Sequence, residues 1–252
     1  MNQRSRINSQ PCFLLHGRPF RDSSQLIDIL SRDHGRLALV ARGIRASRSR
    51  YRGVLRPFVP LELSWTIAGD LGTLTGAEPA GRLPAIEGEA LMAGFYVNEL
   101  VLKLTHRHDP QPDVYEAYAA AVSGLACQPD VEYALRCFEL RLLRAIGYGL
   151  DLEHDMVTGL PVDQDAWYRV RPAEGVTRVT ADGPAAAVFS GAELRDIAAE
   201  RFADPTLLRR ARRILRPAIE HCLEGRELSS RRVMRAMRRR TEAGGDGTER
   251  GE

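Results

Sequence analysis

The sequence predicts an α+β protein in which a small N-terminal β-barrel is followed by a mainly helical domain. The first ~80 residues contain short apolar runs, period-two alternation and turn signals, the pattern of a small barrel. From Glu89 onward the apolar residues recur at helical spacing. Pro79, Gly81 and Pro84 interrupt the chain between these parts. We therefore expect a barrel over residues 1–81 and a helical domain over residues 82–240.

Five short strands are predicted in the barrel, over residues 12–15, 25–30, 36–42, 61–67 and 71–77. A polar turn over residues 18–24 separates the first two. In the third strand, Leu37, Leu39 and Ala41 should share one face, because side chains alternate across a strand. Arg36 and Arg42 should then lie on the opposite face. The fourth strand has the clearest alternation in the chain and is predicted to be half-buried.

Helices are predicted over residues 89–104, 114–125 and 130–146, the last of them ended by Gly147. Glu99 and Lys103 have the i,i+4 spacing of an exposed ion pair. Residues 151–183 look irregular, with one possible hairpin over 167–170 and 176–180. Further on, Ser190 and Glu193 have the spacing of a capping box.

Asp204 followed by proline predicts the start of a long helix with one apolar and one basic face. The arginines of the basic face are Arg209, Arg212, Arg213 and Arg216. A last basic helix is expected over residues 227–240. The polar, glycine-rich residues 241–252 are predicted to be a disordered tail.

Several classes of protein find no support in the sequence. No apolar run is long enough to suggest a membrane span, and the N-terminus lacks the apolar core of a signal peptide, so we expect a cytoplasmic protein. The four cysteines form no pair typical of a zinc ribbon or a disulfide framework. Common catalytic and nucleotide-binding motifs are absent, so no enzyme activity and no cofactor are predicted. His106 and His108, at i,i+2 spacing, favour a solvated helix end over a metal site.

The strongest functional signal is an arginine-rich stretch without acidic residues, in a chain with a formal net charge of only +3. Its arginines are Arg36, Arg42, Arg45, Arg48, Arg50, Arg52 and Arg56. We expect a strand that runs into a basic loop and binds nucleic acid. Positive charge would follow the phosphates while Tyr51 and Phe58 stack on bases, as in OB-folds. Phe58 has a second interpretation as a core residue.

The arginines also have less specific interpretations. Lys103 is the only lysine, which indicates a GC-rich genome, so the preference for arginine proves nothing by itself. A run such as residues 231–240 is as often a solvated face as a binding site. Two alternatives therefore stay open: a regulator that reads duplex DNA through the basic helix 231–240, and a protein scaffold in which the arginines are incidental.

Beyond these patterns, the chain resembles the RecO family of bacterial recombination mediators. The resemblance is carried by the ordered segments FLLHGRPFRDSSQLIDILSRDHGRLALVARGIRASRSRYRGVLRPFVPLELSW, FYVNEL, ALRCFELRLLRAIGYGLDL and ELSSRRVMR, and spans about residues 12–238. It implies an OB-fold followed by a helical domain, without covalent catalysis. It also implies a nucleoid-associated protein that binds single- and double-stranded DNA, anneals complementary strands, and acts with RecR to load the RecA recombinase onto strands covered by single-strand-binding protein.

Two further expectations depend on the resemblance. Some members of the family carry a four-cysteine zinc module after the position of Tyr148, but the matching segment here, DLEHDMVTGLPVD, has no cysteine, so no structural zinc is expected. The family also binds the C-terminal tail of single-strand-binding protein on its helical domain. Candidate residues for that contact are Arg136, Leu140 and Leu143. The alternative is that both leucines are core and that Arg136 pairs with Glu132.

Overall fold

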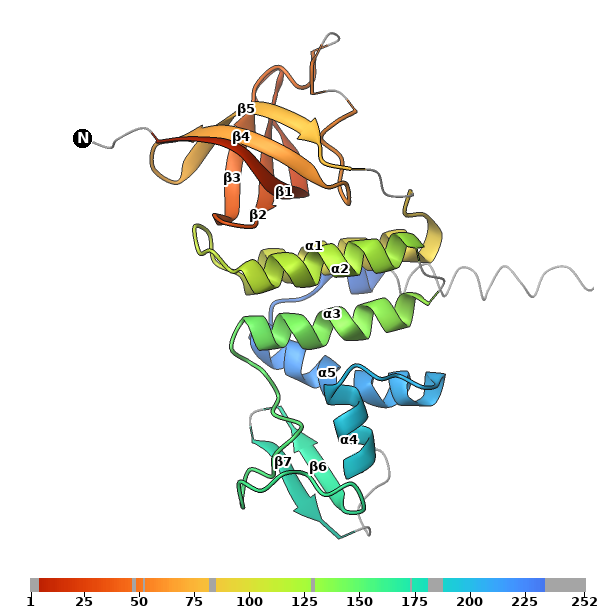
Figure 1. Cartoon of the computed structure of the whole chain (residues 1–252). Helices are drawn as coiled ribbons and strands as arrows, with labels where there is room; N and C mark the ends of the chain where they lie inside the picture. Colours follow the sequence, from red (N-terminus) through yellow and green to blue (C-terminus); the bar gives the residue numbers. More distant parts are fainter. Residues whose placement is uncertain are drawn as a thin grey trace, which may run out of the picture.

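The computed structural model describes residues 5–46, 49–51, 53–81, 85–127, 130–172, 174–180 and 188–233. Figure 1 shows three parts in succession: a β-barrel, a layer of helices, and a small sheet beside the shortest helix. The predicted α+β class is confirmed. No helix among these residues combines the length and the apolar character needed to cross a membrane.

The barrel has five strands, β1 Ser5–Phe20, β2 Ser24–Ser31, β3 Gly35–Ala41, β4 Leu61–Ile67 and β5 Leu71–Pro79. They close in the order β1-β2-β3-β5-β4, with β1 antiparallel to both β2 and β4 and β3 parallel to β5. Every predicted strand is present. The predicted turn over residues 18–24 is wrong, because β1 continues to Phe20.

The length of β1 has a physical cause that its sequence hides. The strand changes register between Ile7 and Gln10 against β4, and again between Leu14 and His16 against β2. Such bulges bend a strand and interrupt its alternation, which lets one strand serve two neighbours in a closed barrel. A period-two search therefore recognises only the central apolar part of β1.

The alternation predicted for β3 is confirmed. Leu37, Leu39 and Ala41 point into the barrel core with Trp65, whereas Val40 lies in a small separate cluster on the outer side. Since β3 has one buried and one outer face, the direction of each side chain on this strand follows from its parity.

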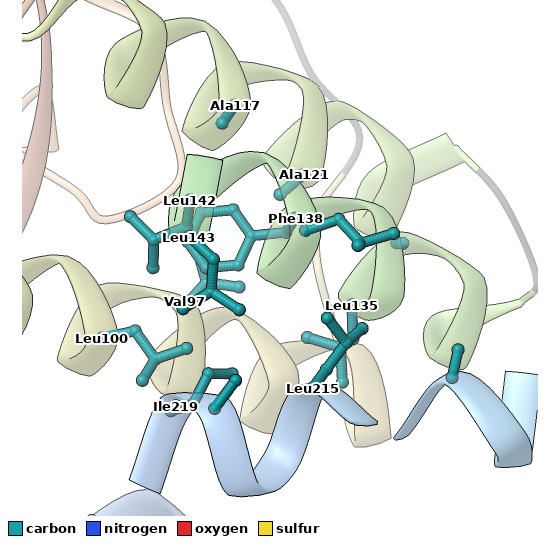
Figure 2. Packing of buried hydrophobic residues seen from close by; sticks show 14 of the residues in the cluster. Val97, Leu100, Ala117, Ala121, Leu135, Phe138, Leu142, Leu143, Leu215 and Ile219 are labelled. Atoms are coloured by element: carbon teal, nitrogen blue, oxygen red, sulfur yellow. The ribbon is translucent and has the colours of Figure 1, made fainter. Parts of the chain in front are cut away.

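The helical part contains α1 Gly88–Leu104, α2 Pro112–Cys127, α3 Val131–Ala145, α4 Gly191–Ala198 and α5 Pro205–Leu223. Figure 2 shows how Val97 and Leu100 meet Phe138 and Leu142 and the α5 residues Leu215 and Ile219. The predicted start and stop signals are confirmed. Ser190 and Glu193 form the capping box, the Asp204 carboxylate accepts from two backbone amides of α5, and the residue after Ile146 is a glycine at φ +79°.

Between α3 and α4, the predicted hairpin is present as β6 Trp167–Arg171 and β7 Gly175–Val179. A third strand, β8 Val188–Ser190, pairs with β6 and was not predicted, because three residues are too few to show a period. The loop before the hairpin is organised by the buried Asp155. Its carboxylate accepts hydrogen bonds from the amides of Val157, Thr158 and Arg178.

The barrel and the helices are joined by a packed junction. The Asn98 side chain donates to the Leu15 carbonyl at 2.7 Å and accepts from the Tyr118 hydroxyl at 2.6 Å, and both polar groups are buried. The Phe13 ring lies 4.9 Å from the Tyr118 ring. Buried hydrogen bonds of this kind hold one geometry, so the two parts have a defined relative orientation.

The expected exposed pair of Glu99 and Lys103 is present at 3.3 Å, but its exposure was predicted wrongly. Glu99 also accepts hydrogen bonds from the backbone amides of Ser229 and Ser230, which begin a helical turn that packs across α1. Burial alone would raise the pKa of Glu99, but the hydrogen bonds from Ser230 and Ser229 outweigh it and lower that pKa. Residues 234–240 of the expected basic helix, and the tail 241–252, lie outside the described residues.

Candidate nucleic-acid interface

Arg36 lies in the junction and not on an open surface. Its guanidinium donates to the Thr105 carbonyl at 2.9 Å and lies 3.9 Å from the Asp28 carboxylate, with 15% of the side chain exposed. Burial, and then the neighbouring Arg107, lower the pKa of Arg36. This arginine is already used by the fold, so it offers little free charge to a ligand.

Arg42 lies beyond the other end of β3 and is exposed. Together with Gly43 it lines two neighbouring clefts on the barrel rim. One cleft also holds Arg50, whose guanidinium donates to the Thr75 carbonyl at 2.8 Å and to the Tyr51 hydroxyl at 2.6 Å. Arg45 is exposed beside the clefts, since its amide donates to the Ser23 carbonyl. We call Arg42, Arg45 and Arg50 the rim arginines.

The rim arginines have no carboxylate partner among the described residues, and no Asp or Glu of that part of the chain lines either cleft. Arg56 is also exposed and lies in the same loop, outside both clefts. Arg48 and Arg52 lie outside the described residues. The sequence prediction of a basic nucleic-acid surface at this loop therefore keeps a geometric basis for Arg42, Arg45 and Arg50.

The prediction that Tyr51 and Phe58 stack on bases is wrong, because both rings are buried. Tyr51 is 5% exposed and belongs to the barrel core, with the Arg50 guanidinium 4.8 Å from its ring centre. Phe58 is 7% exposed and packs against Gly94 and Phe95 of α1. Its interpretation as a core residue is the correct one.

The basic face of α5 is present as predicted, with Arg209, Arg212, Arg213 and Arg216 all exposed. Its charge is partly compensated. Arg212 lies 3.6 Å from Glu132, and Arg216 lies 2.9 Å from Glu220. Arg209 donates to the Thr206 hydroxyl, and Arg213 has no carboxylate partner among the described residues. Two of these four cations are therefore held in ion pairs.

A pocket between α1, α3, α5 and the turn after α5 contains the third predicted site. Arg136 is buried at its floor, 3.0 Å from Glu139 and 3.7 Å from Glu132. The Tyr96 hydroxyl donates to Glu139 at 2.7 Å and accepts from Arg231 at 3.1 Å. Burial raises the pKa of Tyr96, so the phenol stays a donor to the carboxylate. We call this network of two arginines, one glutamate and one tyrosine the helical pocket.

Leu140 and Leu143 do not line the helical pocket. They are 3% and 1% exposed and belong to the helical core, where Figure 2 shows Leu143 beside Val97. The apolar lining of the pocket comes instead from Ala93, Val131 and Leu135. Sequence reasoning did not assign Tyr96 and Arg231 to this site, because they come from the two ends of the helical domain and nothing in the sequence shows that they meet.

Comparison with known proteins gives the family. Residues 6–82 match the model described as recombination protein O N terminal, and residues 87–232 match recombination protein O C terminal. The chain belongs to the RecO family. The two RecO matches meet between β5 and α1, where the barrel ends and the helices begin.

Individual relatives agree with the RecO assignment. The chain is 40% identical over 240 residues to a protein of Dechloromonas aromatica, and the alignment covers 94% of this chain and 99% of the relative. A protein of Azoarcus sp. is 42% identical with the same coverage, and one of Halorhodospira halophila is 45% identical over 91% of this chain and 97% of the relative. All three are described as DNA repair protein RecO.

The metal question is separate from RecO membership. Among the described residues, no three His, Cys, Asp or Glu side chains come together in a way that could hold a metal ion. His154, next to the loop where some relatives were expected to carry cysteines, pairs with Asp151 at 3.0 Å. The absence of a structural zinc stays a prediction.

Proposed function

We propose that this chain binds single- and double-stranded DNA, anneals complementary strands, and helps to load the RecA recombinase onto strands coated by single-strand-binding protein. Membership in the RecO family assigns it to DNA repair and recombination. The observation that carries the finer proposal is the pair of rim clefts, whose arginines have no carboxylate partner in the described part of the chain. It acts without covalent catalysis, in the cytoplasm at the nucleoid.

The mechanism is electrostatic. Each arginine that neutralises a phosphate releases condensed counterions, so binding is strong at low salt and has little sequence preference. The rim arginines and the free cations on α5 belong to two parts joined by the Asn98 and Tyr118 contacts. Two strands held on one protein meet at a raised effective concentration, which speeds annealing.

The helical pocket is the proposed site for the acidic, apolar tail of single-strand-binding protein. Val131 and Leu135 offer an apolar wall, and Arg212 and Arg216 lie at the pocket with their charges exposed. A carboxylate from a peptide could exchange with Glu132 or Glu220 as their partner, while the apolar end of the peptide occupies the wall. RecR is a further proposed partner.

The test is an annealing assay on strands coated by single-strand-binding protein, either intact or without its tail. We expect annealing on the intact coat to be faster than on the truncated coat. The variant with Arg45, Arg48 and Arg50 all changed to glutamine should lose annealing on both. Equal rates on both coats for the wild-type protein would exclude the tail contact, and an unimpaired triple variant would move the DNA site away from the rim.

The alternative of a regulator that reads duplex DNA through residues 231–240 can be tested in the same preparation. Arg231, the first residue of that segment, is already engaged by Tyr96 and by Glu220 at 3.0 Å. Strong preference for one duplex sequence, with weak single-strand binding, would favour the regulator. Lack of DNA binding at low salt would favour a scaffold.

A further inference from the structure

Binding of single strands by an OB barrel usually combines phosphate contacts with an aromatic ring on which a base can stack. The described barrel residues contain five aromatic side chains. Phe13, Tyr51, Phe58 and Trp65 are buried, and Phe20 alone is partly exposed. If bases stack on this barrel through an aromatic side chain, Phe20 is the ring that the fold leaves available.

Phe20 is the last residue of β1 and lies in a concave place. It lines the second rim cleft, of about 520 Å³, between the β1–β2 turn, the end of β3 and the start of β5. That size lies within the range of ordinary small-ligand pockets. The ring packs on Leu26, Ala38 and Val40, which form an apolar cluster outside the barrel core. The ring is therefore held in place by its neighbours.

The surroundings of Phe20 suit a polyanion. The Arg21 guanidinium lies 5.3 Å from the ring centre, and Arg42 lines the same cleft. Asp22 and Asp70 flank the cleft in sequence, but neither of them lines it. Because Arg42 and Gly43 also line the neighbouring cleft that contains Arg50, the cationic surface continues from the β1–β2 turn across the ends of β3 and β5.

We propose that Phe20 stacks on one unpaired base of a single strand, while Arg21 and Arg42 hold the phosphates next to that base and the strand continues towards Arg50. This site rests on the proposed function and adds to it a subsite for a base. Arg21 has to leave the ring when the base enters. An exposed cation–π contact is equivalent to only about a 2- to 5-fold preference, whereas stacking of one base contributes about 5- to 150-fold, so the base displaces the guanidinium.

The test uses the full chain and two probes, a short oligothymidylate and an abasic strand of the same length. Phe20→Leu keeps an apolar side chain against Val40 and removes the aromatic face. We expect this variant to bind the oligothymidylate about tenfold more weakly, with the abasic strand and the salt dependence unchanged. Phe20→Trp should restore the preference for the strand with bases.

Phe58→Leu is the matched control, because it makes the same change on a buried ring. It should leave the ratio of the two affinities unchanged, and thermal unfolding of each variant shows that it is folded. If Phe20→Leu binds the oligothymidylate like the wild type, the stacking site is excluded while the proposed function stands. If the wild-type protein binds neither strand at low salt, the proposed function itself fails.

Discussion

The barrel rim and the helical pocket are both rich in arginine, yet they differ in what surrounds each cation. At the rim, Arg42 and Arg45 have no carboxylate partner among the described residues. In the helical pocket, Arg136, Arg212 and Arg216 lie within 3.7 Å of Glu139, Glu132 or Glu220. The same residue type therefore supplies free charge in one place and structural ion pairs in the other.

This difference indicates what each surface can bind. Unpaired cations attract any phosphate backbone, so the rim suits a long anion of any sequence. Cations that already have partners bind an anion only if it replaces a glutamate and gains further contacts, so the pocket suits a short and specific ligand. The number of arginines in a segment says nothing about which case applies.

The largest expected effect tests whether the arginines of the helical pocket support the fold. Glu139→Gln removes the buried carboxylate that Arg136 and Tyr96 share. Because a buried charge then loses its main partner, the free energy of unfolding should fall by about 3–5 kcal/mol. Urea denaturation measures this difference.

The matched control for that variant is Asp196→Asn, which breaks the exposed pair of Asp196 with Arg201, 2.8 Å apart. Solvent screening limits its cost to less than about 1 kcal/mol. If the two variants lose equal stability, the distinction between structural and surface ion pairs is mistaken.

The next effect concerns free charge at the rim. Changing Arg42, Arg45 and Arg50 to glutamine removes three potential phosphate contacts. The slope of log affinity for single strands against log salt should become shallower by about 2, and the affinity should fall about 100-fold at 0.1 M salt. The comparison variant changes Arg212, Arg213 and Arg216, and its slope should move by less than about 1, since two of these cations are paired. Equal slopes would contradict the assignment of DNA binding to the rim.

A smaller effect should reverse the difference between the two surfaces. In the double variant with Glu132→Gln and Glu220→Gln, Arg212 and Arg216 lose the carboxylates that hold them. One added phosphate contact would strengthen single-strand binding about fivefold at 0.1 M salt. Glu116→Gln, which frees Arg32 from a pair at 3.3 Å, is the control for a general gain in positive charge. Unchanged or weaker binding in the double variant would show that ion pairing does not limit α5.

The smallest effect is the pH dependence of Glu220. Its hydrogen bond from Arg216 lowers its pKa, and the charge of Arg231 acts in the same direction. A depressed pKa contributes stability above the pKa of the unfolded chain, about 4.3, and that contribution is lost as the pH falls through the folded value. The stability difference between the wild type and Glu220→Gln should therefore be constant from pH 8 to about pH 5, at less than about 1 kcal/mol, and shrink only below about pH 4. A change between pH 7 and pH 5 would contradict this assignment.

Most local structure was predictable from the sequence, because it depends on neighbours in the chain. The alternation of Leu61, Leu63 and Trp65 predicted β4, and the capping residues Ser190 and Asp204 predicted the starts of α4 and α5. The buried face of α5 was also predictable from its period. What failed locally was β1, where two bulges hide the period, and β8, which is too short to show one.

The candidate site was only partly predictable. Exposure of Arg42 and Arg45 follows from their place at and beyond the end of a strand. Burial of Tyr51 and Phe58 does not, because it depends on which elements fold over the loop. Arg36 and Arg42 looked equivalent on one strand face, yet one contacts Thr105 across the junction and the other is exposed on the rim.

By itself, the sequence determined the α+β class, the order of the elements, the position of the basic loop and the resemblance to the RecO family. These features depend on residue type and on spacing along the chain. Only the tertiary structure decided which arginines meet a carboxylate, which aromatic ring stays open at Phe20, and that Tyr96 and Arg231 share one pocket. The reason is that pairing and burial depend on residues up to 135 positions apart, and closure of the barrel and packing of the helices bring them together.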